Sequence, residues 1–176
     1  MKRFSLQTVA VMIVASLSVA AQAQSIGWPE ATDALAKEKS KAQACVDLLK
    51  SVADKKTRAE VEPVYLDAKA TSDGVIAGLS TLLVERGKPG DLPGFKDNLE
   101  KAGLGLQKVC DAAAKAAQAS TGKKGPIGEI ITASIGPIVD ALKSAVGGIF
   151  DYWKETKKIE REMILGQLRD AKWPEF

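Results

Sequence analysis

Histidine is absent from this chain of 176 residues. Without it, neither a Ser–His–Asp triad nor a Cys–His pair can activate a nucleophile, and zinc, copper and haem lose a common protein ligand. The Glu-x-x-His pairs of di-iron bundles and the C-x-x-C-H motif of haem attachment are excluded as well. The side chain that ordinarily titrates between pH 5 and 8 is also missing. We therefore expect no catalytic residue, no metal site and no cofactor, and a protein that is not an enzyme.

Aromatic residues are scarce, at 5% of the chain, and no segment alternates apolar and polar residues at period two. Apolar residues instead recur at spacings of three and four, which is typical of amphipathic helices. EF-hand, P-loop and G-x-G-x-x-G motifs are absent. Gly103 and Gly105 lie inside a helical pattern, where we expect them to permit close packing rather than to bind phosphate. These features predict an all-α fold.

Cysteine occurs only twice, as Cys45 and Cys110. In an oxidising compartment an even count favours a disulfide, and two cysteines allow a single intramolecular pairing. If the helices run up, down and up, the first and third are parallel. Each cysteine then lies about 15 residues, or about 22 Å, beyond the start of its own helix. The expected bond closes a loop of roughly 65 residues and contributes about 4 kcal/mol.

The N-terminus has the layout of a secretion signal. Lys2 and Arg3 precede an apolar run, and Ala21 to Ala23 supply a small-x-small site that predicts cleavage before Gln24. The apolar run is shorter than the ~20 residues of a membrane-spanning helix, although an uncleaved anchor is the alternative. We therefore expect residues 1–23 to be a cleaved signal peptide, residues 24–176 to form a single helical-bundle domain, and the protein to be periplasmic or secreted.

Four helical segments are predicted in the mature chain. Their expected bounds are Glu30–Ala53, Arg58–Arg86, Phe95–Ala119 and Pro126–Ala171. We expect the fourth segment to be long and broken near Gly136-Pro137 and Gly147-Gly148. The prediction is an antiparallel bundle of about four helices, pinned by Cys45–Cys110.

Local signals place the ends of the second helix. Thr57 and Glu60 have the spacing of a capping box, while Pro63 predicts either a kink or a later start. Gly87 is a typical helix stop.

The charge gives no reason to expect a nucleic-acid partner. The whole chain has 25 basic and 22 acidic residues. Removal of Lys2 and Arg3 with the signal leaves 25 − 2 = 23 basic residues against 22 acidic ones, a formal charge of +1. Nucleic-acid binding normally needs a strong basic excess. In the last segment, Glu129, Asp140 and Lys143 argue against a membrane span, so we expect no transmembrane helix after cleavage.

Two features of the last segment suggest binding. The apolar arc from Ile127 to Phe150 is wide enough to be a core helix or to meet a membrane, a lipid-like ligand or a partner helix. Aromatic residues gather towards the C-terminus, and we take four of them as a candidate interaction patch: Tyr152, Trp153, Trp173 and Phe176. The alternative is that the two tryptophans cover the open end of the bundle.

Three functions remain open. The leading hypothesis is a non-catalytic exported module that binds an unidentified protein. The first alternative is a carrier of a small apolar or lipid-like ligand, which predicts a core cavity near Ile138, Leu142 and Val146. The second alternative is a carboxylate-only hydrolase, which predicts a cleft with two facing acids. A flat or grooved apolar surface would favour the protein-binding hypothesis.

Overall fold

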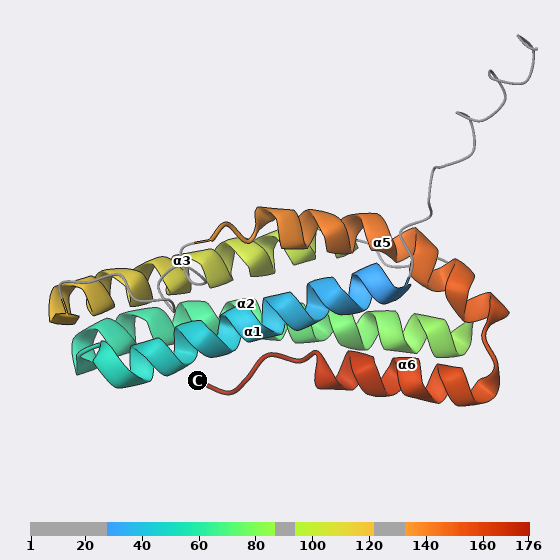
Figure 1. Cartoon of the computed structure of the whole chain (residues 1–176), viewed down its shortest axis with the longest axis horizontal. Coiled ribbons are helices and arrows are strands. Elements are labelled where there is room, and N and C mark those ends of the chain that lie inside the picture. Colours follow the sequence, from blue (N-terminus) through green and yellow to red (C-terminus); the bar gives the residue numbers. More distant parts are fainter. Residues whose placement is uncertain (1–27, 87–93, 122–132) are drawn as a thin grey trace, which may run out of the picture.

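The described residues of the computed structural model, 28–86, 94–121 and 133–176, form an antiparallel helical bundle (Figure 1). The helices are α1 (Trp28–Val52), α2 (Lys55–Glu85), α3 (Phe95–Thr121), α5 (Gly136–Glu155) and α6 (Lys158–Asp170), and these residues contain no strand. Successive helices reverse direction, so α1 runs parallel to α3. The all-α antiparallel prediction is confirmed, but the described residues form five helices rather than about four.

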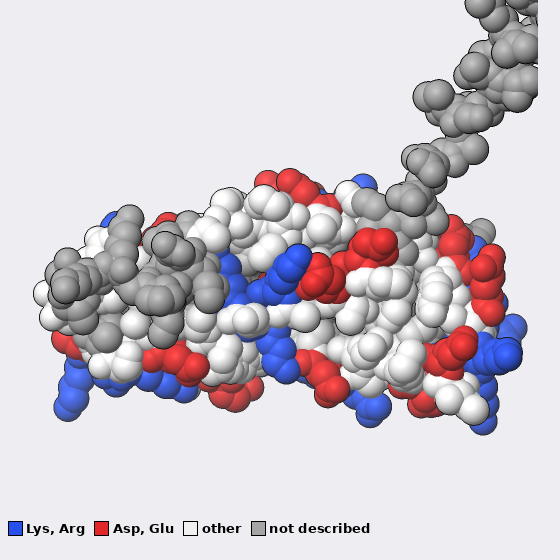
Figure 2. Space-filling view, in the orientation of Figure 1, with Lys and Arg blue, Asp and Glu red and all other residues white. Residues whose placement is uncertain are grey.

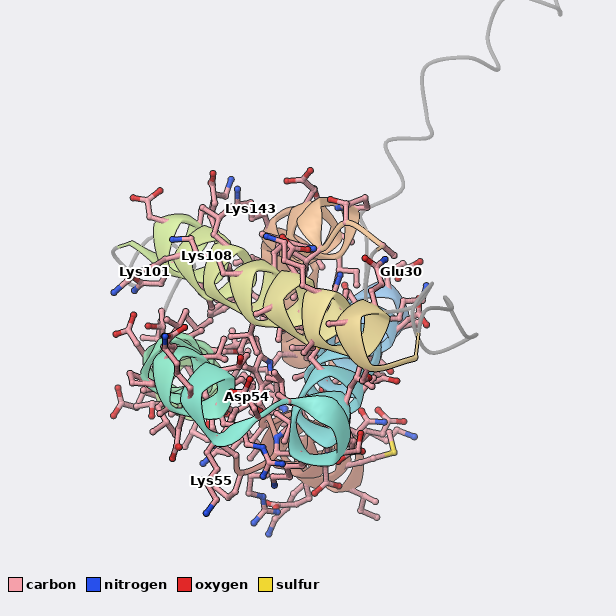
Figure 3. All side chains as sticks on the ribbon, turned by 90° about the vertical axis from the view of Figure 1, so that its left-hand side faces the viewer. Glu30, Asp54, Lys55, Lys101, Lys108 and Lys143 are labelled. Carbon is pink, nitrogen blue, oxygen red and sulfur yellow. A yellow bond between two sulfur atoms is a disulfide. The ribbon has the colours of Figure 1, made fainter. Side chains whose placement is uncertain are left out.

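Asp54 is the N-cap residue of α2 and lies where α1 and α2 meet (Figure 3). Its carboxylate accepts a hydrogen bond from the backbone N–H of Thr57 at 2.8 Å, and this bond lowers the pKa of Asp54. The predicted capping box is therefore wrong, because Thr57 is already inside the helix. Pro63 lies well inside α2 and does not mark its start.

The helix α2 ends at Glu85, one residue before the predicted last helical residue, Arg86. Arg86 adopts the left-handed conformation with φ of 58°. Its N–H reaches back to the carbonyls of Leu82 and Leu83, which closes the last turn. Gly87, the predicted stop, lies outside the described residues.

Two breaks were predicted in the last helical segment. The one near Gly136-Pro137 coincides with the start of α5, which follows the non-helical residues 133–135, whereas the one at Gly147-Gly148 is wrong. Gly136 and Pro137 stand at the start of α5, where proline fits the first helical turn. Gly147-Gly148, the second predicted break, lies inside α5. The buried side chains on both sides of this pair, including Val146 and Phe150, hold the helix together through it. The predicted start at Pro126 lies outside the described residues.

A break that was not predicted lies at Thr156-Lys157, where the chain reverses into α6. Thr156 is extended, with ψ of 149°, and its hydroxyl donates to the carbonyl of Trp153 at 3.0 Å. Arg161 donates to the same carbonyl at 3.2 Å, and the Lys157 N–H donates to the Glu160 carboxylate at 3.2 Å. Polar contacts thus satisfy the helix ends at the turn, and no glycine is needed there.

Close approach of helices depends on two glycines of α3. A Cβ at Gly105 would lie 2.6 Å from the Cβ of Ala68 on α2, and a Cβ at Gly103 would lie 2.6 Å from Val139 on α5. The expectation that these glycines permit close packing is confirmed. The helix α2 makes its most extensive contact with α3, while α1 packs against α5 and α3.

The disulfide joins α1 to α3 as predicted. Cys45 and Cys110 are bonded, with their Cα atoms 5.1 Å apart and a sequence separation of 65. Both cysteines are fully buried. The bond therefore links the two parallel helices inside the core. Among the described helices, none is both long enough and apolar enough to cross a membrane.

Candidate functional site

The four aromatic residues predicted as an interaction patch do not form one exposed surface. Trp153 is 7% exposed and Trp173 is 3% exposed, so both are buried, whereas Tyr152 is 37% exposed. Phe176 is partly buried and packs against the core. Trp153 lies under Arg161, whose guanidinium carbon is 5.2 Å from the ring centroid. The burial of both tryptophans agrees with the alternative interpretation, in which they cover the bundle.

Residues 171–176, here called the C-terminal tail, pack against α2 around Tyr65. The ring centroid of Tyr65 is 6.0 Å from that of Trp173 and 5.6 Å from that of Phe176. The Tyr65 hydroxyl donates to the carbonyl of Pro174 at 2.7 Å. The backbone N–H of Trp173 donates to the Asp73 carboxylate at 3.3 Å. The tail is thus held by both ring contacts and hydrogen bonds.

Charged contacts hold the outer part of the tail. Lys69 of α2 forms ion pairs with Asp73 at 2.5 Å and with Glu175 at 3.2 Å. Burial acts to lower the pKa of Lys69, but these two carboxylates outweigh it and raise the pKa. Lys50 of α1 donates to the carbonyl of Glu175 at 3.4 Å. The tail therefore bridges α1 and α2.

A buried polar cluster lies beneath the tail. Glu38 of α1 is 1% exposed, and burial raises its pKa from 4.5 to about 7. The Trp173 indole is close enough to oppose this rise, while Asp73 adds to it. The indole and the carboxyl do not reach hydrogen-bonding geometry, and Glu38 Oε1, Trp173 Nε1 and the buried Ser72 Oγ have no hydrogen-bond partner among the described residues. Glu38 therefore supplies the titration between pH 5 and 8 that the absence of histidine had seemed to remove.

Lys41 is a second buried charged residue, and it forms hydrogen bonds close to the start of α5. Its ammonium donates to Gln107 Oε1 of α3 at 3.1 Å and to the carbonyl of Ala133. The same Gln107 oxygen accepts from the Ile135 N–H at 3.2 Å. Burial lowers the pKa of Lys41, although Asp111 opposes this effect. This network therefore holds three segments of the bundle together.

An open groove runs along the outward face of α1, and we call it the α1 groove. Its volume is about 880 Å³. Its lining follows α1 at helical spacing from Trp28 to Ser51, with Leu35, Ala44 and Leu48 as apolar members. That interval corresponds to about 35 Å of helix. In Figure 2 the surface between α1 and α6 is largely uncharged, with acidic and basic side chains at its margins.

Gln167, Asp170 and Ala171 complete the lining of the α1 groove. The Trp28 indole donates to Gln167 Oε1 at 2.7 Å, which fixes this end of α1 against α6. Lys39 donates to the carbonyl of Asp170. The groove lining does not include Ile138, Leu142 or Val146, where a core cavity was expected for the carrier hypothesis.

Glu38 and Asp73 are two carboxyl groups from different helices, α1 and α2. They influence each other electrostatically, but Glu38 is buried and is not part of the groove lining. The described residues hold no cluster of three or more Cys, Asp or Glu side chains that could bind a metal ion.

Searches of protein-family models, curated proteins and solved structures gave no match for this chain. The geometry of the α1 groove and of the polar cluster is therefore the basis for inferring function.

Sequence reasoning missed Glu38 and Ser72, although a signal was present. Glu38 comes three residues after Leu35 and four before Ala42, and Ser72 lies four after Ala68 and three before Val75. Both positions therefore belong to apolar stripes. A charged or polar residue at such a position indicates a buried polar group from the sequence pattern alone.

Proposed function

We propose that this protein is an exported, non-catalytic module that binds an apolar segment of another protein in the α1 groove. The observation that carries the proposal is the groove itself, with its elongated shape and the apolar side chains Leu35, Ala44 and Leu48 along α1. Amphipathic helices commonly bind in apolar grooves of this kind, with their apolar side chains contacting the groove at helical spacing. Polar side chains at the margin, such as Gln43 and Asp47, would set the orientation of the bound segment.

Export is a separate part of the proposal, supported by the signal-like N-terminus and by the disulfide, which suits an oxidising compartment. Intact-mass measurement of the protein recovered from the periplasm or medium tests it. A chain beginning at Gln24 is expected. If the recovered chain keeps Met1, the N-terminus is an uncleaved anchor and the prediction of a cleaved signal is wrong.

A second candidate is a carrier of a small apolar ligand. The volume of about 880 Å³ falls within the range of small-molecule sites. The open and elongated shape favours a protein segment, but the same apolar lining would accept an acyl chain. The hydrolase hypothesis gains less support, because Glu38 has no exposure to a substrate.

Photo-crosslinking tests the binding proposal directly. We would place a photoreactive amino acid at Ser40, an exposed position in the groove, and at exposed Ala77 of α2 as the control. Discrete protein adducts are expected from Ser40 alone. Ala36→Arg, which puts a long charged side chain into the groove, should remove them, whereas Ala77→Arg should not.

The outcomes separate the candidates. Lipid or small-molecule adducts from Ser40, without protein adducts, would support the carrier instead. Equal labelling from Ser40 and Ala77 would contradict the proposal that the α1 groove is a binding site.

A further inference from the structure

A small cavity, here called the basic cavity, lies at the end of the bundle where α2 ends and α5 turns back into α6 (Figure 1). Its volume is about 280 Å³. Its lining combines basic and apolar residues and contains no acidic one: Arg86, Lys154, Arg161, Leu83, Phe150 and Trp153. The apolar members are buried, whereas Arg86 and Lys154 are exposed and Arg161 is partly exposed. The cavity therefore has an apolar wall and a positively charged opening.

Arg161 is held in a fixed position beside this wall. Its guanidinium carbon lies 5.2 Å from the centroid of the Trp153 ring, and its Nε–H donates to the carbonyl of Trp153 at 3.2 Å. Arginine carries five N–H donors in a planar fork, and this hydrogen bond uses one of them. Because Trp153 is buried, it keeps the guanidinium oriented. Arg161 is thus prepared to donate to an anion with little further loss of side-chain entropy.

The positive charge of the basic cavity is only weakly neutralised. Among the described residues, no carboxylate forms an ion pair with Arg86 or Arg161. Lys154 pairs with Asp151 at 3.1 Å, but these side chains are 71% and 70% exposed. A pair so exposed to solvent contributes little. An anion that enters the cavity would therefore meet three cations and reduce the repulsion among them.

The backbone of Arg86 is a second, independent observation. Among the described residues, Arg86 is the only one other than glycine with a positive φ, and its value is 58°. It ends α2 in the left-handed conformation, which glycine adopts without the steric cost that a Cβ brings. Residues held in such conformations are concentrated at functional sites. Arginine at this position is less favourable for the fold than glycine, but it supplies a cation to the cavity.

We propose that the basic cavity binds a small amphipathic anion, with a carboxylate or phosphate head group and a single ring or short chain as its apolar part. The head group accepts charge-assisted hydrogen bonds from Arg86, Lys154 and Arg161, whose guanidinium groups match the paired oxygens of such a head group. The apolar part packs against Leu83 and Phe150.

The size of the cavity sets the size of the ligand. Its volume of about 280 Å³ lies just below the range of about 300–1,000 Å³ that is usual for small-molecule sites. It therefore suits one ring or a short chain rather than a lipid with two acyl chains. The lining shares no residue with that of the α1 groove, so this inference does not depend on the proposed function.

Titration of the purified, isotope-labelled protein with phenyl phosphate and with benzoate tests the proposal, and NMR spectra of the N–H groups follow it at constant ionic strength. Saturable shifts are expected at the Trp153 indole N–H and the Arg161 Nε–H with at least one of the two probes, at a Kd on the order of 1 mM. The tighter probe identifies the head group. Inorganic phosphate lacks the ring and benzyl alcohol lacks the charge, so each should bind about 10-fold more weakly.

Three variants at exposed positions refine the test. Arg86→Gly should weaken binding by on the order of 10-fold and also raise the urea midpoint, because it removes a cation together with the left-handed strain. Lys154→Gln should weaken binding without that gain in stability. Lys158→Gln is the matched control, since it removes the same charge at the start of α6 from a residue outside the cavity lining. It should bind as the wild type does.

Three results would overturn the proposal. In the first, neither probe gives saturable shifts at Trp153 and Arg161. In the second, inorganic phosphate or benzyl alcohol binds as tightly as the better probe, which indicates an adventitious ion or a merely apolar hollow. In the third, Lys158→Gln weakens binding as much as Lys154→Gln and Arg86→Gly do, which indicates a general attraction of anions to this end of the bundle.

Discussion

Two glycines show how single positions set the spacing of this bundle. Gly105 allows α3 to approach Ala68, and Gly103 allows it to approach Val139. The same residue type has the opposite meaning at Gly74, where an added Cβ would meet nothing within 4 Å. Within a helix, glycine is unfavourable by about 1 kcal/mol relative to alanine unless it permits contact. Neighbouring atoms therefore decide whether a given glycine stabilises the fold.

Gly105→Ala should destabilise the protein because its Cβ would lie 2.6 Å from the Cβ of Ala68. Overpacking of this kind costs about 1–3 kcal/mol, partly offset by helix propensity. Gly74→Ala is the matched control and should stabilise the fold by roughly 0.5–1 kcal/mol. Urea denaturation measures both. A Gly105→Ala protein as stable as Gly74→Ala would show that α2 and α3 can separate without cost.

At the scale of elements, α6 and the tail complete the bundle by covering it. The predicted last helix turns back at Thr156-Lys157, which carries Ile164 and Leu168 into the core. The tail then places Trp173 against Tyr65. Of the C-terminal aromatic residues, Trp153 and Trp173 are therefore buried in the fold, whereas Tyr152 is exposed.

Trp173→Ala should lower the free energy of unfolding by about 3–5 kcal/mol, since it removes a large side chain that is 3% exposed. Tyr152→Ala, at a position that is 37% exposed, should change it by less than about 1 kcal/mol. Thermal or urea unfolding followed by circular dichroism compares the two. Similar small losses in both variants would mean that the tail contributes little to the fold.

At the scale of the whole molecule, one covalent bond and one buried acid act on the stability of the entire chain. The Cys45–Cys110 bond closes a segment that contains all of α2. Glu38 is buried on α1, and the charge of Asp73 on α2 adds to the rise of its pKa. Changes in redox state and in pH should therefore be visible in global unfolding.

Reduction of the disulfide should lower the free energy of unfolding by about 4 kcal/mol, because the unfolded chain regains the freedom of a loop that spans 65 residues. Denaturation with and without a reductant measures this change, and Cys45→Ala/Cys110→Ala provides the control without added reductant. Thiol labelling of the unreduced, denatured protein should find no free thiol. Two labelled thiols would contradict the bond.

Stability should also fall as the pH rises from about 4.5 to 7. The folded state raises the Glu38 pKa from 4.5 to about 7, so between these values the folded protein binds a proton that the unfolded chain has released. The slope of stability against pH is therefore negative in this interval, and the loss reaches roughly 3 kcal/mol at pH 8. Glu38→Gln should remove this decline and unfold at higher urea than the wild type at pH 8. A wild type whose stability relative to Glu38→Gln is constant from pH 4.5 to pH 8 would refute the assignment.

Features that depend on neighbours in the chain or on covalent chemistry could be predicted without the fold. The spacing of apolar residues predicted α1, α2 and α3 to within a few residues, because helix periodicity is local. Two cysteines at equal depth in parallel helices predicted Cys45–Cys110, because no other intramolecular pair exists. Even Gly103 and Gly105 were identified as packing positions from their place in a helical pattern.

Tertiary structure alone decided which surfaces meet and which stay open. The turn at Thr156-Lys157 depends on Arg161 and Glu160 reaching back across it, and the pKa of Glu38 depends on burial beneath Trp173. The α1 groove is lined by residues of α1 together with Gln167, Asp170 and Ala171. Such outcomes require contacts between segments distant in sequence, and a linear pattern holds no information on the separation of those segments in space.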